Sequence, residues 1–474
     1  MNRQETALNK ADILNNLPPK WAEDLMPEIN NAIKARNQKV IVLDDDPTGT
    51  QTVHDVTVIT GWSVEVLEAE LRDPSPAVFV LTNTRSMPEK QARAVNHEIA
   101  TNLNYASART GRDFVIVSRS DSTLRGHFPA ETDVLARELA DKFDGVLIIP
   151  AFMAGERYTI HGVHYVGDDE RLIPASETPF AKDSAFGYST SVMRDWVAEK
   201  TGGTVHADEV LCIDIDLIRS EGASAVAEQL LTLNNHAYCV MDAVTERDLE
   251  VITMAILQAE AQGKRFLYRT AASFAAVRAG ITLRPLLTMD ELQTGRAGGG
   301  LVVVGSYVPK SSAQLMHLLE HSDIHAIEVN VNALLDDRKR TGEIKRVIDN
   351  ADLILASDQN VVIFTSRLLI SGENADSSLN IGGQVSRSLV EIVRGLQVSP
   401  RFIVAKGGIT SSDLATDALN VQCARVIGQI LPGIPVWKLG DESAQPDLIY
   451  VVFPGNVGSV SSLTEVVKKF DAAN

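Results

Sequence analysis

The sequence predicts an α/β protein of two domains, each with a mainly parallel β-sheet flanked by helices. Short runs rich in β-branched residues alternate with longer segments of helical period, as expected for parallel strands joined by helices. The apolar residues of these runs are continuous, which is typical of strands covered on both faces. Polar residues follow the runs directly, at the carboxyl ends where open α/β sheets bind ligands.

The expected strands fall into two groups along the chain. The first group is "KVIVLDD", "AVFVLTNTR", "DFVIVSRSD", "GVLIIPAF", "YCVMDAV" and "RFLYRTA". The second group is "LVVVGS", "AIEVNV", "NVVIFTS", "RFIVAKGG" and "LIYVVFPGN". Segments of helical period between them include residues 129–142, 246–263, 378–395 and 412–431.

A linker-like segment separates the two groups. The sequence "MDELQTGRAGGG", residues 289–300, is polar and ends in three glycines, which is typical of a flexible connection. The sequence therefore predicts a boundary near residue 295, with one domain over 38–295 and a smaller one over 296–474. Residues 1–37 are expected to add one or two helices ahead of the first strand.

Composition excludes several classes of function. The chain has 474 residues, 45% of them hydrophobic, and a net charge of -18. This charge repels phosphate backbones, so nucleic-acid binding is not expected. No apolar run approaches the roughly 18 residues that cross a bilayer, the N-terminus lacks the apolar core of a secretory signal, and the three cysteines have no C-x-x-C spacing. We expect a cytoplasmic protein without membrane partners.

The stretch "IVLDDDPTGT" places Asp44, Asp45 and Asp46 directly after an apolar run. Adjacent carboxylates repel unless something cationic shares the site, and a magnesium ion, a phosphoryl group or a proton transfer would each account for them. A solvated turn is the alternative for any one of these residues. Alternating side-chain direction should send Asp45 to the opposite face from Asp44 and Asp46, so the three cannot share one role.

A second polar segment, "SRSDSTLRGH", follows another expected strand. It holds two arginines, an aspartate and several hydroxyls, which together suit a small polyhydroxy acid, because guanidinium groups bind carboxylates while Asp and Ser bind hydroxyls. Arg85, one strand earlier, could complete such a clamp. A polar loop with internal turns is the alternative. Asp242 and Arg269 also follow expected strands.

Two glycine-rich turns lie in the second half of the chain. "KGGITSSDLATDAL" leads from a strand into a helix, with Thr410 and Asp413 as the expected capping pair. Gly407 and Gly408 would expose consecutive N–H groups to a phosphate, and "PGNVG" forms a similar turn after a later strand. The segment "VGSYVPKSS" lacks the spacing of a P-loop, and no G-x-G-x-x-G follows a strand, which disfavours a dinucleotide-binding dehydrogenase.

Taken in order, "DDDPTGT", "TNTRS", "SDSTLRG", "GERYTIHGVHYV", "GSY", "KGGITSSD" and "PGNVG" resemble the four-carbon acid sugar kinase family over nearly the whole chain. The resemblance implies a substrate domain over 38–295 and a nucleotide-binding domain over 296–474, with the active site in the cleft between them. It implies ATP and Mg2+ as cofactors, a sugar acid as partner, and threonate, erythronate or 3-oxo-tetronate as the acceptor of a phosphoryl group, and it leaves a homodimer possible.

The resemblance also implies roles for individual residues. Catalysis would depend on the paired aspartates, Asp45 and Asp46, of which one would take the hydroxyl proton while a second acid helps to hold the metal. The substrate would contact Arg85, Asp121, Ser122, Arg125 and Gly126. The nucleotide would contact Ser306, Gly407, Gly408, Ile409, Thr410 and Gly455. A noncatalytic sugar-acid sensor with the same fold is the alternative, although a sensor has no use for two phosphate-binding turns.

Overall fold

The computed structural model describes the chain except residues 1–7, 140–142, 283, 307, 367–374 and 474. Parts of the expected N-terminal extension, of the helix expected over 129–142 and of the "GSY" motif, at Tyr307, therefore lie outside the described residues. The chain forms two compact units, one of Met1–Thr52 with Gly61–Leu283 and the other of Val53–Thr60 with Arg284–Asn474. Both are α/β, as the sequence predicts.

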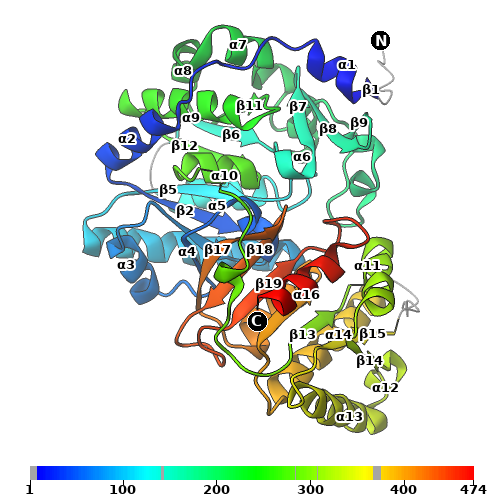
Figure 1. The fold of residues 1–474 in the computed structure, drawn as a ribbon. Coiled ribbons are helices and arrows are strands. Elements are labelled where there is room, and N and C mark those ends of the chain that lie inside the picture. The colour runs from blue at the N-terminus through cyan, green and yellow to red at the C-terminus, as the bar shows by residue number, and fades with distance from the viewer. Residues whose placement is uncertain (1–7, 140–142, 283, 307, 367–374, 474) are drawn as a thin grey trace. The chain divides into compact units, whose positions relative to one another are not determined.

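The first unit contains a parallel sheet with the strand order β10-β11-β6-β12-β5-β2-β4. Figure 1 shows its central strands side by side. The strands of this sheet are β2 (Lys39–Asp44), β4 (Ala77–Leu81), β5 (Phe114–Arg119), β6 (Gly145–Ile149), β10 (Leu211–Ile213), β11 (Ala237–Met241) and β12 (Phe266–Thr270). Every residue of β2, β4, β6 and β12 is buried, which explains their continuous apolar runs.

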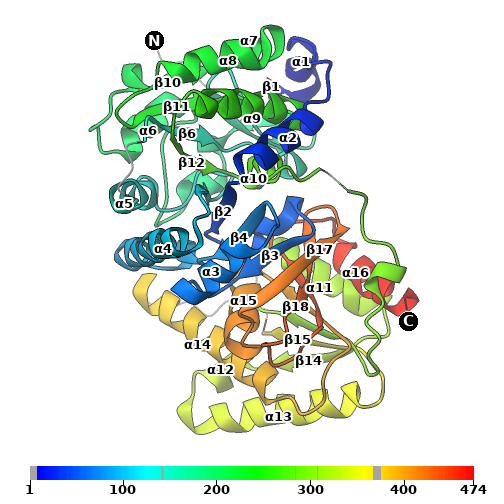
Figure 2. The ribbon, with the colours of Figure 1, turned by 90° about the vertical axis from the view of Figure 1, so that its left-hand side faces the viewer.

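The helices of the first unit are mostly short connections between these strands. They are α1 (Lys10–Asn15), α2 (Met26–Arg36), α3 (Val64–Arg72), α4 (Glu89–Thr110), α5 (Ala130–Glu138), α6 (Met193–Lys200), α7 (Ile215–Ser220), α8 (Gly222–Leu231), α9 (Glu246–Ala261) and α10 (Ala272–Arg278). Figure 2 shows α3 and α4 side by side, and α2, α8 and α10 pack against α9.

A small antiparallel sheet, β1-β9-β8-β7, completes the first unit and was not expected from the sequence. Its strands are β1 (Leu8–Asn9), β7 (Arg157–Ile160), β8 (Val163–Asp168) and β9 (Arg171–Pro174). The strands have only two to six residues, too few for a periodicity that sequence reasoning can detect.

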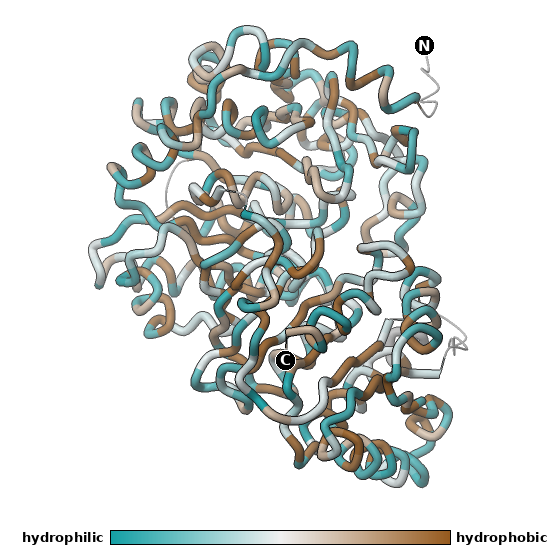
Figure 3. The backbone as a smooth tube through the Cα atoms, in the orientation of Figure 1, coloured by the Kyte–Doolittle hydropathy of each residue, from teal (hydrophilic) through white to brown (hydrophobic). Residues whose placement is uncertain are grey.

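The second unit has a mixed sheet with the order β3-β17-β18-β19-β16-β13-β15-β14. Its strands are β3 (Val56–Ile59), β13 (Leu301–Val304), β14 (His325–Val329), β15 (Val361–Thr365), β16 (Phe402–Lys406), β17 (Cys423–Leu431), β18 (Ile434–Leu439) and β19 (Ile449–Phe453). Its helices are α11 (Pro309–His321), α12 (Val331–Leu334), α13 (Asp337–Leu355), α14 (Ala375–Gly395), α15 (Gly408–Asp413) and α16 (Ser462–Ala472). Figure 3 shows the hydrophobic character of its central strands.

The helix expected over 412–431 is wrong. Helix α15 ends at Asp413, a π-helical turn covers Leu414–Ala418, and β17 then pairs antiparallel with β18. Burial along β17 alternates, which is the period of a strand with one covered face. The expected capping pair is also wrong, because the helix begins at Gly408, so that Thr410 lies inside it. The carboxylate of Asp413 instead accepts a hydrogen bond from the Ser386 hydroxyl.

Two segments group differently from the domain ranges given by the sequence. Residues 284–295 belong to the second unit, because Leu287 and Leu292 lie in its apolar core with Val302, Phe402 and Val451. Residues 53–60 also belong to it, because β3 pairs with β17. The second unit is therefore discontinuous in sequence.

Candidate active site

The strand register of the first unit brings three polar segments together. Asp44, at the end of β2, is opposite Leu81 of β4 and Arg119 of β5, and Arg119 is opposite Thr270 of β12. The residues that follow each strand therefore leave the sheet at the same edge. This is the carboxyl edge, where open α/β sheets place their ligands.

Asp44 is the aspartate of the three that lies closest to Arg119, with which it forms a buried ion pair. Its Oδ1 lies 2.8 Å from Nη1 of Arg119, and both side chains are almost fully buried. Burial raises the pKa of Asp44 to about 7, although the Arg119 guanidinium opposes this shift. A Cβ atom at Gly49 would lie 1.9 Å from the carboxylate, so only glycine allows the 3-10 turn of Pro47–Thr52 to approach this closely.

Asp45 differs from its neighbours in that one of its carboxylate oxygens receives no hydrogen bond from the described residues. Its Oδ2 accepts a hydrogen bond of 2.8 Å from the Ser120 hydroxyl. Its Oδ1 is buried and has no hydrogen-bond partner among the described residues, and it lies 3.7 Å from Nη1 of Arg119 and 3.9 Å from Nη2 of Arg85. A buried acceptor without a donor is costly in a folded protein, so such an atom calls for an explanation, of which a catalytic role is one.

Asp46 forms an ion pair with Nη2 of Arg85, and its Oδ1 accepts a hydrogen bond of 2.8 Å from the Thr48 amide. Burial would raise the pKa of Asp46, but the charges of Arg85 and Arg119 and the bond from Thr48 outweigh burial and hold the pKa below its usual value. Asp46 is therefore an ionised partner of arginine.

The expected alternation of the three aspartates is wrong. Strand β2 ends at Asp44, so the alternation does not continue, and both Asp45 and Asp46 lie within ion-pair distance of Arg85. In the part of the chain that the structure describes, Arg85 and Arg119 supply the positive charge that makes the adjacent carboxylates compatible.

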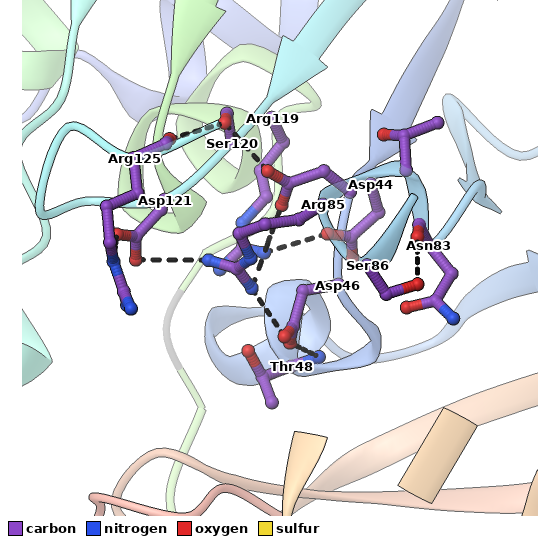
Figure 4. A network of polar contacts seen from close by, with 12 residues as sticks. Asp44, Asp46, Thr48, Asn83, Arg85, Ser86, Arg119, Ser120, Asp121 and Arg125 are labelled. Atoms are coloured by element: carbon purple, nitrogen blue, oxygen red, sulfur yellow. Dashed lines mark hydrogen bonds and ion pairs between the residues drawn. The ribbon is translucent and has the colours of Figure 1, made fainter. Parts of the chain in front are cut away.

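Arg85 joins the aspartate motif to the loop after β5, as Figure 4 shows. Its Nη1 lies 3.1 Å from Asp121 Oδ1, and Asp121 Oδ2 lies 2.7 Å from Nε of Arg125. Burial would raise the pKa of Asp121, but Arg125 and Arg85 hold it well below its usual value. The expected substrate residues Arg85, Asp121 and Arg125 thus form one chain of ion pairs.

The remaining two expected substrate residues lie in the same loop. Gly126 has a φ of 117°, and a Cβ atom there would lie 2.4 Å from Ser120 Oγ and 3.3 Å from Asp45 Oδ2. The carbonyl oxygen of Ser122 lies 2.7 Å from Nε2 of His164. The structure therefore brings all expected catalytic and substrate residues to one edge of one sheet.

Three residues that support this loop were given no role from the sequence. Arg269, at the end of β12 and 1% exposed, donates to the carbonyl oxygens of Asp121 at 3.0 Å and Arg125 at 2.8 Å. His164 holds the Ser122 carbonyl, and the Tyr188 hydroxyl donates to the Thr123 carbonyl at 2.8 Å. Arg269 is visible in the sequence as a polar residue at a strand end, and His164 lies in the motif "GERYTIHGVHYV", whereas nothing in the sequence singles out Tyr188.

The second unit brings its glycine turns together around Ser306. A Cβ atom at Gly407, where φ is 121°, would lie 3.0 Å from Ser306 Cβ, and one at Gly455 would lie 3.4 Å from Ser306 Oγ. A Cβ atom at Gly305 would lie 2.2 Å from Thr410 Oγ1. Among the expected nucleotide residues, Ser306, Gly407, Thr410 and Gly455 are therefore neighbours. Gly408 begins α15, and the Ile409 side chain is exposed.

Lys406 is a buried cation beneath these turns. Its Nζ donates to the carbonyl oxygens of Pro454 at 2.5 Å and Gly455 at 3.1 Å, and it lies 4.1 Å from the centre of the Phe453 ring. No carboxylate pairs with it among the described residues. Burial, together with the charge of Lys310, lowers the pKa of Lys406 to about 7.

No group of three or more His, Cys, Asp or Glu side chains suited to a metal ion occurs in the described ranges of the chain. A magnesium ion carried by nucleotide phosphates needs only one or two protein carboxylates, so the donor set fits an ion of that kind. None of the helices described here combines the length and apolar character that crossing a membrane requires.

Two family models match this chain, and each matches residues that fall largely within one of the two units. Residues 40–278 match the family model of a sugar-binding N-terminal domain, and residues 301–463 match that of a nucleotide-binding C-terminal domain. A search of curated proteins finds no match. The chain is thus of the class that combines a sugar-binding with a nucleotide-binding domain.

Two solved structures share the fold. A Salmonella typhimurium LT2 protein provisionally named a tRNA synthase aligns with a TM-score of 0.66 over 90% of this chain and 98% of its own, at 18% identity. A Haemophilus influenzae protein of the family DUF1537 aligns with a TM-score of 0.61 over 91% of this chain and 100% of its own, at 19% identity. The chain belongs to the four-carbon acid sugar kinase family, formerly DUF1537.

Proposed function

We propose that this protein transfers the γ-phosphoryl group of ATP to a hydroxyl, the terminal one, of a four-carbon sugar acid such as threonate, erythronate or 3-oxo-tetronate. The family and its sugar-binding and nucleotide-binding domains support this proposal. The observation that carries it is Asp45 Oδ1, a buried carboxylate oxygen without a hydrogen-bond partner among the described residues, at the carboxyl edge of the sheet.

Asp45 is suited to act as the general base. Ser120 fixes its Oδ2, so that Oδ1 is the oxygen available to a substrate hydroxyl. As the hydroxyl oxygen forms its bond to the γ-phosphorus, its proton passes to Asp45, while the bond between phosphorus and the bridging oxygen breaks and ADP leaves. Asp46 is the poorer base, because its ion pair with Arg85 keeps its pKa low.

Phosphoryl transfer depends mainly on positioning and on compensating the charge of the transferred group. The turns at Gly407 and Gly455 would bind nucleotide phosphates through backbone N–H groups, which glycine leaves accessible. Magnesium, when bound with the nucleotide, would neutralise charge on the β- and γ-phosphates. Asp46 is the carboxylate such an ion would reach, because its side chain is 19% exposed whereas that of Asp45 is 4% exposed.

A coupled assay of ADP release tests the proposal. The protein is supplied with magnesium and ATP, and with D- and L-threonate, D- and L-erythronate and their 3-oxo forms in turn. Turnover with one acid, lost in Asp45→Asn, is the expected result. ATP binding without turnover on any acid would overturn the substrate class, and the absence of both ATP binding and turnover would favour a sugar-acid sensor.

A further inference from the structure

The arginines around the loop after β5 differ in whether a carboxylate of the protein already neutralises them. Arg85 pairs with Asp46 and Asp121. Arg125 pairs with Asp121 at 2.7 Å and approaches Asp183 at 3.6 Å. These two residues, which the sequence suggested as ligands of a substrate carboxylate, therefore already have anionic partners.

Two further arginines near this loop have no carboxylate partner among the described residues. Arg269 is fully buried, and its donors are directed at backbone carbonyl groups, so it braces the loop. Arg157, the first residue of β7, is partly exposed and can be reached from solvent. Its Nη1 donates to the Gly155 carbonyl, while its Nε is buried and has no hydrogen-bond partner in the described chain.

The position of Arg157 relates it to the substrate loop. The guanidinium carbons of Arg125 and Arg157 lie 5.0 Å and 5.9 Å from the centre of the same Phe180 ring. The acid next to Arg157 in sequence, Glu156, is occupied, because it forms an ion pair with Lys10. Arg157 thus adds a cation without a carboxylate partner among the described residues, close enough to Asp121 and Arg125 for their charges to act on it.

A partly buried guanidinium without an anionic partner is energetically unfavourable in a folded protein. Removing a cation from water costs several kcal/mol unless an anion and hydrogen bonds replace the lost hydration. Burial lowers the pKa of Arg157, and the charge of Asp121 only partly opposes this shift. An anion bound to Arg157 would offset this partial loss of hydration.

We propose that Arg157 binds the carboxylate group of the acid substrate and so selects sugar acids over neutral sugars and polyols. The inference rests on the proposed function, since the anion it assigns is the carboxylate of the four-carbon acid. The planar fork of the guanidinium binds a carboxylate through two parallel hydrogen bonds. Asp45 Oδ1, which has no hydrogen-bond partner among the described residues, remains available for a hydroxyl group of the same molecule.

The test compares Arg157→Gln with the wild-type protein on an acid and on its neutral analogue. Binding of D-erythronate and D-threonate, and of the polyols erythritol and threitol, is measured by calorimetry, and KM and kcat by ADP release. We expect the variant to bind the preferred acid at least about thirtyfold more weakly, the range for loss of one partner of a buried charge pair. Its affinity for the polyol should be unchanged.

Two further variants keep the test decisive if Arg157→Gln is unstable. Arg157→Lys retains the charge without the fork and should give an intermediate KM. Arg157→Ala should regain acid binding when guanidinium ion is added. Arg171→Gln is the matched control, because Arg171 is an exposed arginine of the same small sheet, paired with Asp168, and its loss should leave acid binding unchanged.

The outcomes separate the inference from the proposed function. If the wild-type protein phosphorylates an acid and Arg157→Gln has the same KM for it, the assignment of Arg157 is overturned and the kinase function stands. If the wild-type protein neither binds nor phosphorylates any of the four-carbon acids, both are overturned. Equal loss of acid and polyol binding would also overturn the assignment, because it would indicate a structural role.

Discussion

The Ser120 hydroxyl donates a hydrogen bond of 2.8 Å to Oδ2 of Asp45. This contact distinguishes the two oxygens of the carboxylate, since Oδ1 has no hydrogen-bond partner among the described residues. Asp44 and Asp46 lie closer to the neighbouring arginines than Asp45 Oδ1 does, so Asp45 is the one of the three that we propose as the base.

The substitutions Asp45→Asn and Asp46→Asn should have unequal effects on turnover. Loss of the general base in Asp45→Asn should lower kcat roughly a hundred- to ten-thousandfold. Asp46→Asn leaves Asp45 in place but removes one of the ion pairs that hold Arg85, and should mainly raise KM. Steady-state kinetics of ADP release measure both. Near wild-type turnover in both variants would contradict the base assignment, and a larger kcat loss in Asp46→Asn would exchange the two roles.

Gly126→Ala should damage catalysis more than stability. The added methyl group would meet Ser120 Oγ and Asp45 Oδ2, so we expect kcat to fall by roughly one to two orders of magnitude through misplacement of the base. Gly263→Ala is the control, because Gly263 also has a positive φ, of 93°, but nothing lies within 4 Å of its Cβ position. An equal fall of kcat in both variants would show that backbone strain, not the contact with Asp45, is responsible.

Nucleotide binding should depend on pH through Lys406. Its pKa of about 7 means that the ammonium form is partly lost at neutral pH, and a bound anion favours the protonated form. ADP affinity should therefore fall, by about tenfold, as pH rises through 7. Calorimetry from pH 6 to 8.5 should show this slope in the wild-type protein and not in Lys406→Met.

Lys310→Met is the matched control for that measurement. Lys310 reaches the same turn from outside, with Nζ 3.4 Å from the Asn456 carbonyl, and no buried cation is lost when it is replaced. The variant should keep a pH slope but show it at higher pH, because the Lys310 charge that helps to lower the pKa of Lys406 is gone. A wild-type slope in Lys406→Met would exclude Lys406 as its source.

Asp242 should make stability depend on pH independently of the active site. Its buried carboxylate accepts hydrogen bonds from the amides of Gly162 and Ile215, and burial raises its pKa to about 7. Between pH 4 and 7 the folded state retains a proton that the unfolded chain releases, so the free energy of unfolding should fall as pH rises, by at most about 1.4 kcal/mol per pH unit.

Asp242→Asn cannot titrate and should lack this component. Urea unfolding of the variant and the wild-type protein at several pH values measures the difference between their stabilities. Relative to the wild-type protein, the free energy of unfolding of the variant should rise between pH 4 and 7 and stay constant above pH 7. A difference independent of pH would contradict the assignment.

The sequence predicted the parallel strands because their apolar runs are long and buried on both faces, and it placed Asp45, Arg85 and Asp121 at strand ends for the same reason. It did not predict that Arg119 would neutralise Asp44, because that pairing depends on the register of β2 and β5. The π-helical turn and β17 were also missed, since short apolar runs with helical flanks fit either period.

His164 shows a second limit of sequence reasoning. It lies in an antiparallel sheet of short strands, and its role comes only from the loop that its Nε2 contacts. Contacts between segments far apart in the chain have no local signal, whereas the order of motifs along the chain is visible in the sequence alone.

Strand β3 has a consequence for how the second unit can form. Residues 53–60 are synthesised long before the partner strand β17, so the β3–β17 pairing closes late and over a great length of chain, which slows folding. A fragment that begins at Arg284 would lack β3 and would leave the edge of β17 unpaired. Unpaired strand edges form hydrogen bonds with other chains, so we expect such a fragment to associate through β17. The nucleotide-binding half should therefore be soluble and monomeric on its own only when residues 53–60 are supplied, for example as a separate peptide.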